Sequence, residues 1–303
     1  MPDTPAPAPF GGQAVVEGVM IRGQRQVAVA VRSPQGDILT RDTSVTAVSP
    51  ALRRIPLVRG LVVLAESLSI GMRALRWSTA VAGGERAGDL GPARIPFAPM
   101  ILLGTVIFCV PVLLTFWIDW LPGNDFASVI AEGLVRFAML AGYVALLGAV
   151  PEFQRLFAYH GAEHRAIHAF EHGRPLTTDE VRAFPNAHAR CGTAFLLTLV
   201  VLAGVVFLLF GAPPLWLRLL ERLLLAPVIA AIAYELLRLS QRYAATPIVA
   251  AIFRPNLWMQ RLTTRDPDDA QIEVAIVALE RALELEVSAA AAGAPDRAAE
   301  PLA

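Results

Sequence analysis

The sequence predicts a mainly α-helical, multi-pass membrane protein with about four transmembrane helices, an interfacial helix and a small N-terminal β-hairpin element. Apolar residues make up 55% of the 303 residues and charged residues only 17%, so the chain is more apolar and less charged than an average soluble domain. The apolar residues gather in runs of about 20, the length that crosses a bilayer as a helix. The most strand-like patterns lie near the N-terminus.

The N-terminal region divides into two parts. Residues 1–10 are rich in Pro and Ala and lack the features of a signal peptide, so we expect a disordered lead-in. Residues 11–50 form a Gly-rich β-hairpin region, in which QVAVAVRS and DILTRDTSV flank the turn signal PQGD. The preceding stretch GGQAVVEGVMIRG allows close backbone approach, and it is either a substrate loop or a tight entry into the hairpin.

Residues 51–285 are expected to form a helical membrane domain. Residues 55–80 have helical periodicity, but charged residues such as Arg59 and Glu66 interrupt it, which favours an interfacial or partly re-entrant helix. Glu132 and Arg136 are four residues apart, so they can pair on one face of the second span. The four expected spans cover about residues 95–118, 127–150, 193–213 and 223–240.

The distribution of arginine predicts the orientation of these spans. Eleven arginines precede the first span, none lies in the link to the second, five lie in residues 151–192 and six follow residue 240. Because positively charged segments stay in the cytoplasm, both termini and the His-rich segment 151–192 are expected there. Arg218 and Arg222 lie in the link between the third and fourth spans and fit this rule poorly.

The charge balance also bears on partners. The formal net charge is zero, and the sequence has no basic stripe with interleaved aromatic residues, so no nucleic-acid partner is expected. The lipid bilayer is the expected partner, whereas the substrate and the oligomeric state are left unknown.

The C-terminal part predicts a cytoplasmic helix over residues 267–285. Asp266 is expected to cap this helix, and Pro267 suits the first helical position. Apolar residues follow at helical spacing. Residues 286–303 are dominated by Ala and predict a disordered tail.

Four of the five histidines fall in the stretch YHGAEHRAIHAFEHG, residues 159–173. Pro151 can start a helix and Gly173 can end it, so these histidines are expected on one helix. A step of four residues advances only about 40° around the helix axis. The residues expected on one face are therefore His160, His164, His168 and Glu171.

This face is interpreted as a metal site. The stretch HGAEH, residues 160–164, matches the H-x-x-E-H pattern, in which the two histidines bind zinc and the intervening Glu163 acts as general base. A catalytic zinc needs a third protein ligand. The residues that could supply it are His168, Glu171, His188 and Cys191.

A second interpretation of the same face stays open. Here His160, His164 and His168 bind the metal together, supported by Glu163 or His188. Zinc is the preferred divalent metal, with iron or manganese as alternatives for such nitrogen and oxygen ligands.

A further group, NAHARCGTAF, precedes the third span at residues 186–195. His188 and Cys191 lie on the same expected side of the membrane as the His-rich helix, so they could complete its site. Alternatively, Cys191 packs at the start of the span and His188 caps a loop.

Four blocks of this sequence, in order, resemble the signature blocks of the YqhQ family. They are GGQAVVEGVMIRG, YHGAEHRAIHAFEHG, HARCGTAFLL and LWMQRLTTRDPDDAQIEVAI. The resemblance implies an uncharacterised multi-pass protein of the bacterial cytoplasmic (inner) membrane, labelled a predicted metal-dependent enzyme. It implies a metal centre but no substrate. Where the family usually has Pro, this chain has Ala189, and the candidate ligands His188 and Cys191 are retained.

Three functions remain open from the sequence. The first is a metal-dependent hydrolase at the cytoplasmic face, in which Glu163 takes a proton from water. The second is a metal transporter or sensor, which the absence of charged residues from the first and third expected spans disfavours. The third is a non-enzymatic membrane assembly or scaffold protein, in which the histidines are structural.

Overall fold

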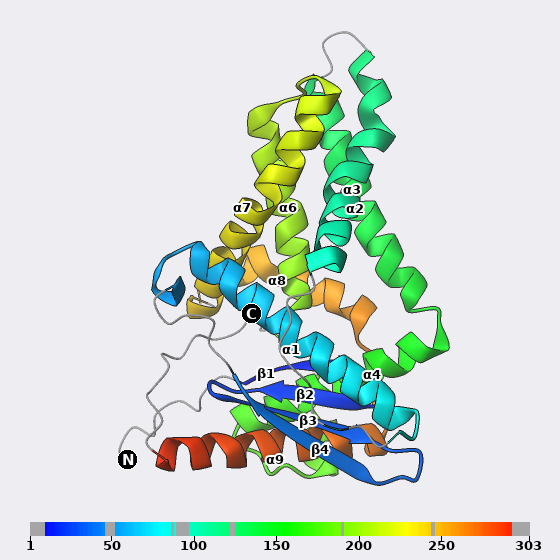
Figure 1. Cartoon of the computed structure of the whole chain (residues 1–303), viewed down its shortest axis with the longest axis vertical. Helices are drawn as coiled ribbons and strands as arrows, with labels where there is room; N and C mark the ends of the chain where they lie inside the picture. Colours follow the sequence, from blue (N-terminus) through cyan, green and yellow to red (C-terminus); the bar gives the residue numbers. More distant parts are fainter. Residues whose placement is uncertain are drawn as a thin grey trace.

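The protein consists of a helical bundle that stands on a layered body of a sheet and packed helices (Figure 1). The computed structural model describes residues 10–45, 52–85, 88, 97–120, 125–188, 191–243 and 246–292. Residues 1–9 of the expected lead-in and residues 293–303 of the expected tail lie outside the described residues, whereas Phe10 is buried. The expected start of the tail at residue 286 was wrong, because the last helix continues to Ala291. The bundle comprises α2 (Phe97–Thr115), α3 (Asp125–Leu147), α6 (Thr193–Phe210) and α7 (Leu215–Arg242).

The body contains a four-stranded antiparallel sheet in the order β1-β2-β3-β4. Its strands are β1 (Gly11–Val15), β2 (Gly18–Arg22), β3 (Gln26–Arg32) and β4 (Ile38–Ser44). The β3–β4 pair confirms the predicted hairpin, since it turns at residues 33–37. The Gly-rich stretch before it is not a loop, because it forms the β1–β2 hairpin. Gly18 is required there, since a Cβ atom would lie 2.2 Å from the carbonyl oxygen of Ala30.

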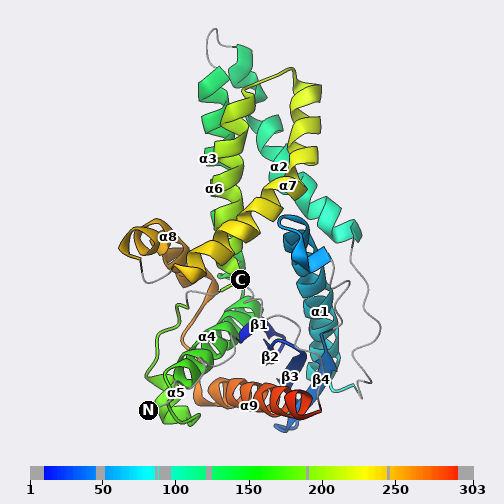
Figure 2. The same cartoon turned by 90° about the vertical axis from the view of Figure 1, so that its left-hand side faces the viewer.

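Helices cover both faces of the sheet (Figure 2). Successive side chains of a strand point to opposite faces, and β3 is apolar at every position from Val27 to Val31. Helix α1 (Val58–Ala82) packs Ile70, Ala74 and Trp77 against one face. Helices α4 (Pro151–Glu171) and α9 (Asp269–Ala291) pack against the other. The position of α1 at a membrane surface remains a prediction.

Among the described residues, three helices are long and apolar enough to cross a membrane: Phe126–Leu147, Thr193–Phe210 and Leu215–Arg242. Gly104–Ile118 is apolar but shorter, so the fourth expected span remains a prediction. The expected span over residues 223–240 begins too late in the sequence. The helix begins at Leu215 and includes the two arginines that were assigned to a link.

Those two arginines are tolerated inside α7 because they share a buried carboxylate. Nη2 of Arg218 lies 3.0 Å from Oε2 of Glu132, and Nε of Arg222 lies 3.0 Å from Oε1. The predicted pair within α3 is confirmed, with Nη2 of Arg136 2.5 Å from Glu132. The side chains of all four residues are at most 1% exposed. An uncompensated charge in an apolar bundle is very costly, so this group joins α3 to α7.

The sequence predicts both ends of helix α4 correctly, but not the residue that caps the last helix. Helix α4 begins at Pro151, and Gly173 follows it with a φ of 64°, as the sequence predicts. The predicted cap of the last helix was wrong. Asp268, not Asp266, accepts a hydrogen bond from the backbone of Gln271, whose side chain accepts one from the backbone of Asp268. This reciprocal capping box satisfies two backbone donors at once and sets the start of α9 at Asp269.

Replacing Glu132 by Gln should destabilise the bundle by about 3 to 5 kcal/mol, because three buried guanidinium groups lose their shared carboxylate. Thermal unfolding in detergent would measure the change. The matched control is Glu152→Gln, since Glu152 is exposed at the start of α4. Equal stability of the two variants would show that the cluster is not essential to the bundle.

Candidate metal centre

Helix α4 has an apolar face that packs against the body and a polar face that carries the candidate ligands. One face packs apolar side chains against the sheet and α9, including Tyr159, Ala162 and Ala166. The other carries the histidines, which face two chain segments, residues 186–191 and 260–266. The sequence therefore places the candidate ligands on a helix that the hydrophobic core fixes in position.

The segment after α8 (Pro247–Thr263) approaches the backbone of α4 closely at Gly161. A Cβ atom at this position would lie 2.2 Å from the carbonyl oxygen of Arg265, so any larger residue would push the segment away. Arg165 holds the same segment, with Nη2 2.5 Å from Oδ1 of Asp266. Its Nε also donates to Oδ1 of Asn186 at 2.6 Å, which ties the two segments together.

His160, His164 and Cys191 form the first group of candidate ligands. One ligand atom from each lies within 4.8 Å of the others. Nδ1 of His160 donates to the carbonyl oxygen of Thr263 at 2.8 Å, and Nδ1 of His164 donates to that of Asn186. A carbonyl oxygen can only accept, so both protons are fixed on Nδ1, and each Nε2 is left for another partner. Nε2 of His160 lies 3.2 Å from Sγ of Cys191.

Glu163 lies beside this group. Its Oε2 atom is 3.5 Å from Nε2 of His164 and has no hydrogen-bond partner among the described residues. The residue is 2% exposed. Gly12 of β1 makes room for it, because a Cβ atom there would lie 2.5 Å from Oε1 of Glu163. The Gly-rich hairpin therefore contributes a wall of the site.

His168, Glu171 and His188 form the second group, again with ligand atoms within 4.8 Å of one another. Nε2 of His168 donates to the carbonyl oxygen of Ala187 at 2.8 Å, and Nδ1 is buried without a hydrogen-bond partner among the described residues. Nε2 of His188 lies 3.2 Å from Oε2 of Glu171. The rings of His168 and His188 are 4.5 Å apart and those of His164 and His188 5.7 Å apart, so the two groups are neighbours on successive turns of α4.

The surroundings set different protonation states in the two groups. Burial opposes ionisation of the Cys191 thiol, yet His160 and His164 outweigh it and hold its pKa well below the usual value. Burial alone would lower the pKa of His160, but Cys191 and Glu163 raise it to about 9. In the second group, burial and the neighbouring histidines lower the pKa of His168 to about 4, and burial also lowers that of His188. Neutral imidazole and thiolate are the forms that bind metals.

All six predicted ligands thus lie in one region, and the residue beside His160 and His164 is Cys191, one of the four candidates for the third ligand in the first interpretation. The grouping of His168 with His160 and His164 in the second interpretation does not occur. Cys191 completes the group of His160 and His164, whereas His168 belongs with Glu171 and His188. His172 joins neither group, since its Nδ1 donates to the carbonyl oxygen of His168 at 2.8 Å and its side chain is exposed.

Several supporting residues were not predicted from the sequence. Gln260 is fully buried, and its side-chain amide makes two hydrogen bonds of 2.8 Å with the backbone of His188. The carbonyl groups of Thr263, Asn186 and Ala187 orient the histidines. A backbone carbonyl group can accept a hydrogen bond whatever the side chain is, so the sequence does not reveal these acceptors. The block LWMQRLTTRDPDD was nevertheless singled out by its resemblance to a family block.

Comparison with known proteins places the chain in a family. Residues 55–285 match the model of a family described as "Protein of unknown function (DUF1385)". The "Uncharacterized protein YqhQ" of Bacillus subtilis (strain 168) is 32% identical over 298 residues, which cover 92% of this chain and 94% of that protein. The chain belongs to the YqhQ family. No solved structure matches it. Membership of the YqhQ family supplies no reaction, so the chemistry must be argued from the site.

In metal-free protein, alkylation of Cys191 by iodoacetamide should be nearly as fast at about pH 6.5 as at about pH 8.5, because a lowered pKa leaves the thiolate in place at the lower pH. Replacing His160 by Ala removes the facing cation, so burial raises the thiol pKa and the rate at the lower pH should fall about tenfold. Peptide mass spectrometry in a Cys109→Ser background measures the rate.

The exposed His172→Ala variant is the matched control for that experiment and should behave as the parent. A wild-type rate that rises with pH as for an ordinary cysteine would contradict the pairing of Cys191 with His160.

Proposed function

We propose that this chain is a membrane-anchored metal-dependent enzyme, a hydrolase whose metal centre faces the cytoplasm. The observation that supports this most is the fixed orientation of His160 and His164. Metal-binding histidines usually donate their second ring N–H to a carbonyl or carboxylate, which fixes the ring and the tautomer. Here both rings do so, and both Nε2 atoms are left beside the Cys191 sulfur.

The donor set suits zinc. Imidazole nitrogen and thiolate are both ligand types of zinc, and three protein ligands leave the open fourth position that a catalytic zinc needs. With bonds of about 2.0 to 2.3 Å, ligand atoms of a tetrahedral zinc site lie roughly 3.3 to 3.8 Å apart. The 3.2 Å from Nε2 of His160 to Sγ of Cys191 and the 4.8 Å limit for the group are compatible with that spacing after small shifts. Iron or manganese remain alternatives, above all at the His168–Glu171–His188 group.

Glu163 supplies the base that hydrolysis needs. Zinc would act as a Lewis acid and make water nucleophilic near neutral pH. The Oε2 atom of Glu163 is buried and accepts no hydrogen bond from the described residues, so it is positioned to take a proton from that water. The Nδ1 hydrogen bonds of His160 and His164 keep the ligand geometry fixed while the proton moves.

The arginine distribution supports the proposed orientation. The sheet, α1, α4 and α9 all lie at one end of the bundle (Figure 1). Of the 26 arginines, eleven precede the first expected span, five lie in residues 151–192 and six follow residue 240. The positive-inside rule therefore favours the bacterial cytoplasmic membrane, with this body and both termini in the cytoplasm. Arg218 and Arg222 no longer oppose the rule, because Glu132 neutralises part of their charge within the bundle.

The alternative functions have less support from the geometry. A metal transporter or sensor needs ionisable groups along a path through the spans, whereas the buried charges of α3 and α7 contact one another. A scaffold role gives no reason for a buried thiolate beside two oriented imidazoles.

One specific contact favours a second candidate, a metal-free thiol enzyme. Cys191 lies 3.2 Å from Nε2 of His160, and the carbonyl of Thr263 orients that ring from its other side. A nucleophile, a base and a group that orients the base are the parts of a nucleophilic thiol site. Metal analysis separates the two candidates, since bound zinc would also block alkylation of Cys191.

Purified wild-type protein should contain close to one equivalent of zinc or more, and the variants His164→Ala and Cys191→Ser should lose most of it, because a site with two remaining ligands binds zinc weakly. Elemental analysis by inductively coupled plasma mass spectrometry gives the metal content. His172→Ala removes an exposed histidine of the same helix and should keep the metal. Metal-free wild-type protein after expression with added zinc would exclude the metal-dependent enzyme.

The variant Glu163→Gln should retain its zinc and lose turnover by at least about a hundredfold, since an amide cannot accept the proton. Wild-type protein and this variant would be incubated with a whole bacterial extract, and compounds consumed by the wild type alone would be identified by mass spectrometry. Equal consumption by both would show that Glu163 is not the base.

A further inference from the structure

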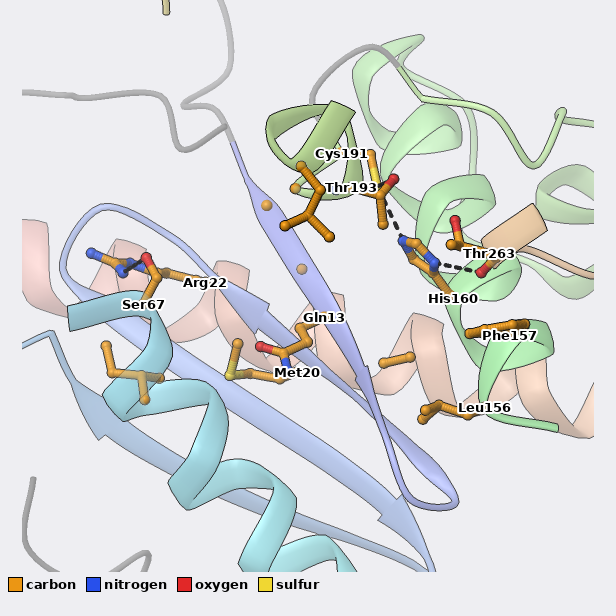
Figure 3. A pocket seen from close by; sticks show the side chains of 16 residues that line it. Gln13, Met20, Arg22, Ser67, Leu156, Phe157, His160, Cys191, Thr193 and Thr263 are labelled. Carbon is orange, nitrogen blue, oxygen red and sulfur yellow. Dashed lines mark hydrogen bonds between the residues drawn. The ribbon is translucent and has the colours of Figure 1, made fainter. Parts of the chain in front are cut away.

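A cavity of about 380 Å³ extends from the metal centre along the sheet (Figure 3). Cys191 and His160 line one end of it, together with Thr193. Strands β1 and β2 form its floor, α1 and α4 contribute walls, and the start of α6 closes another side. Its size lies in the range of sites for small organic ligands.

Arg22 and Ser67 line the end of the cavity that lies away from the metal centre (Figure 3). Gln13 and Met20 lie between the two ends in the same view. Arg22 is 5% exposed, which is unusual for a guanidinium group. A buried arginine on a cavity wall is well suited to hold the anionic group of a ligand.

The ion pairs around Arg22 leave positive charge at this end. Nη2 of Arg22 lies 2.6 Å from Oε2 of Glu66, and Nη1 donates to Oγ of Ser67 at 3.0 Å. Arg53 contacts the same Oε2 atom, so one carboxylate serves two guanidinium groups. Nε of Arg22 has no hydrogen-bond partner among the described residues. An anionic ligand would balance the remaining charge.

The other lining residues are largely apolar, and one of them lies on a helix that is apolar enough to cross a membrane. Leu156 and Phe157 come from α4, and Ile70 comes from α1. Leu196 lies in the first turn of Thr193–Phe210, one of the helices that can cross a membrane. An acyl chain that leaves the cavity beside Leu196 would therefore enter the apolar layer that surrounds this helix.

We propose that the cavity binds an anionic single-chain lipid, with its phosphate at Arg22, its ester bond near His160 and Cys191, and its acyl chain along Leu156, Phe157 and Leu196. The substrate class rests on the proposed hydrolase function, whereas lipid binding rests on the cavity alone. Lysophosphatidic acid has these three parts in this order, so it is the probe. The matched neutral lipid is a monoacylglycerol with the same chain.

Native mass spectrometry of the purified full-length protein would compare 1-lauroyl-lysophosphatidic acid, 1-lauroylglycerol and inorganic phosphate. The lysophosphatidic acid should bind as a single adduct about tenfold more tightly than the neutral lipid, because Arg22 pairs with its phosphate. Arg22→Gln should remove this preference, and Arg22→Lys should restore part of it as a point charge.

A second variant tests the chain-binding part even if Arg22→Gln does not fold. Leu196→Trp places a larger side chain in the cavity and should weaken binding of both lipids about tenfold. The matched control on the same helix is Leu209→Trp, because Leu209 is 82% exposed and distant from the cavity lining. This control should bind both lipids as the wild type does.

Three results would overturn the lipid assignment. They are equal binding of the charged and neutral lipids, lipid binding unchanged by Leu196→Trp, and inorganic phosphate binding as tightly as the lysophosphatidic acid. Bound metal would be measured in the same samples. Lipid binding without any bound metal would reject the metal-dependent hydrolase and keep the cavity assignment. Bound metal without lipid binding would keep the metal centre and reject the cavity assignment.

Discussion

The hydrogen bonds from the histidine rings of α4 to backbone carbonyl groups are the interaction on which the candidate site depends. Each of these bonds joins the helix to a distant part of the chain, at Thr263, Asn186 or Ala187. They require the backbone of two segments to approach α4 closely, which Gly161 permits. Buried carbonyl groups need donors, and the histidine rings supply them. The same hydrogen bonds therefore satisfy the buried carbonyl groups of the two segments and orient the histidine rings.

The opposite face of α4 explains how such a polar face is held. Ala162, Ala166 and Ala169 are fully buried against the sheet and α9. Small side chains allow close packing, so the position of α4 is set by the body and not by the site. A metal centre on a rigid helix keeps its ligands in place before any ion binds. The sheet contributes directly as well, because Gly12 leaves the space that Glu163 occupies.

The sequence predicted those features that depend on local patterns. The extent of α4, its stop at Gly173 and the pair of Glu132 with Arg136 all follow from spacing within one helix. The inclusion of Arg218 in a helix could not be predicted this way, since its partner Glu132 lies 86 residues away. Charged residues normally end an apolar run, and only the tertiary contact reverses that rule.

The grouping of the ligands shows the same limit. Spacing put six candidates on or near one helix face, but spacing alone cannot decide which loop residue joins which histidine. Cys191 and His188 are only three residues apart, yet they belong to different groups. The difference arises because Gln260 holds the backbone of His188 beside the second group, while Cys191 lies at the start of α6. A glutamine far along the chain thus decides the ligand sets.

The protonation of the first group suggests how the fold tolerates the site before metal binds. Four atoms with lone pairs, from His160, His164, Glu163 and Cys191, converge in a buried space. Without a positive charge among them they would repel one another. With a pKa of about 9, His160 carries a proton at neutral pH and faces the Cys191 thiolate. In the proposed metal-bound state zinc would replace this proton, and the bond from Nδ1 of His160 to the carbonyl oxygen of Thr263 would leave Nε2 free to bind it.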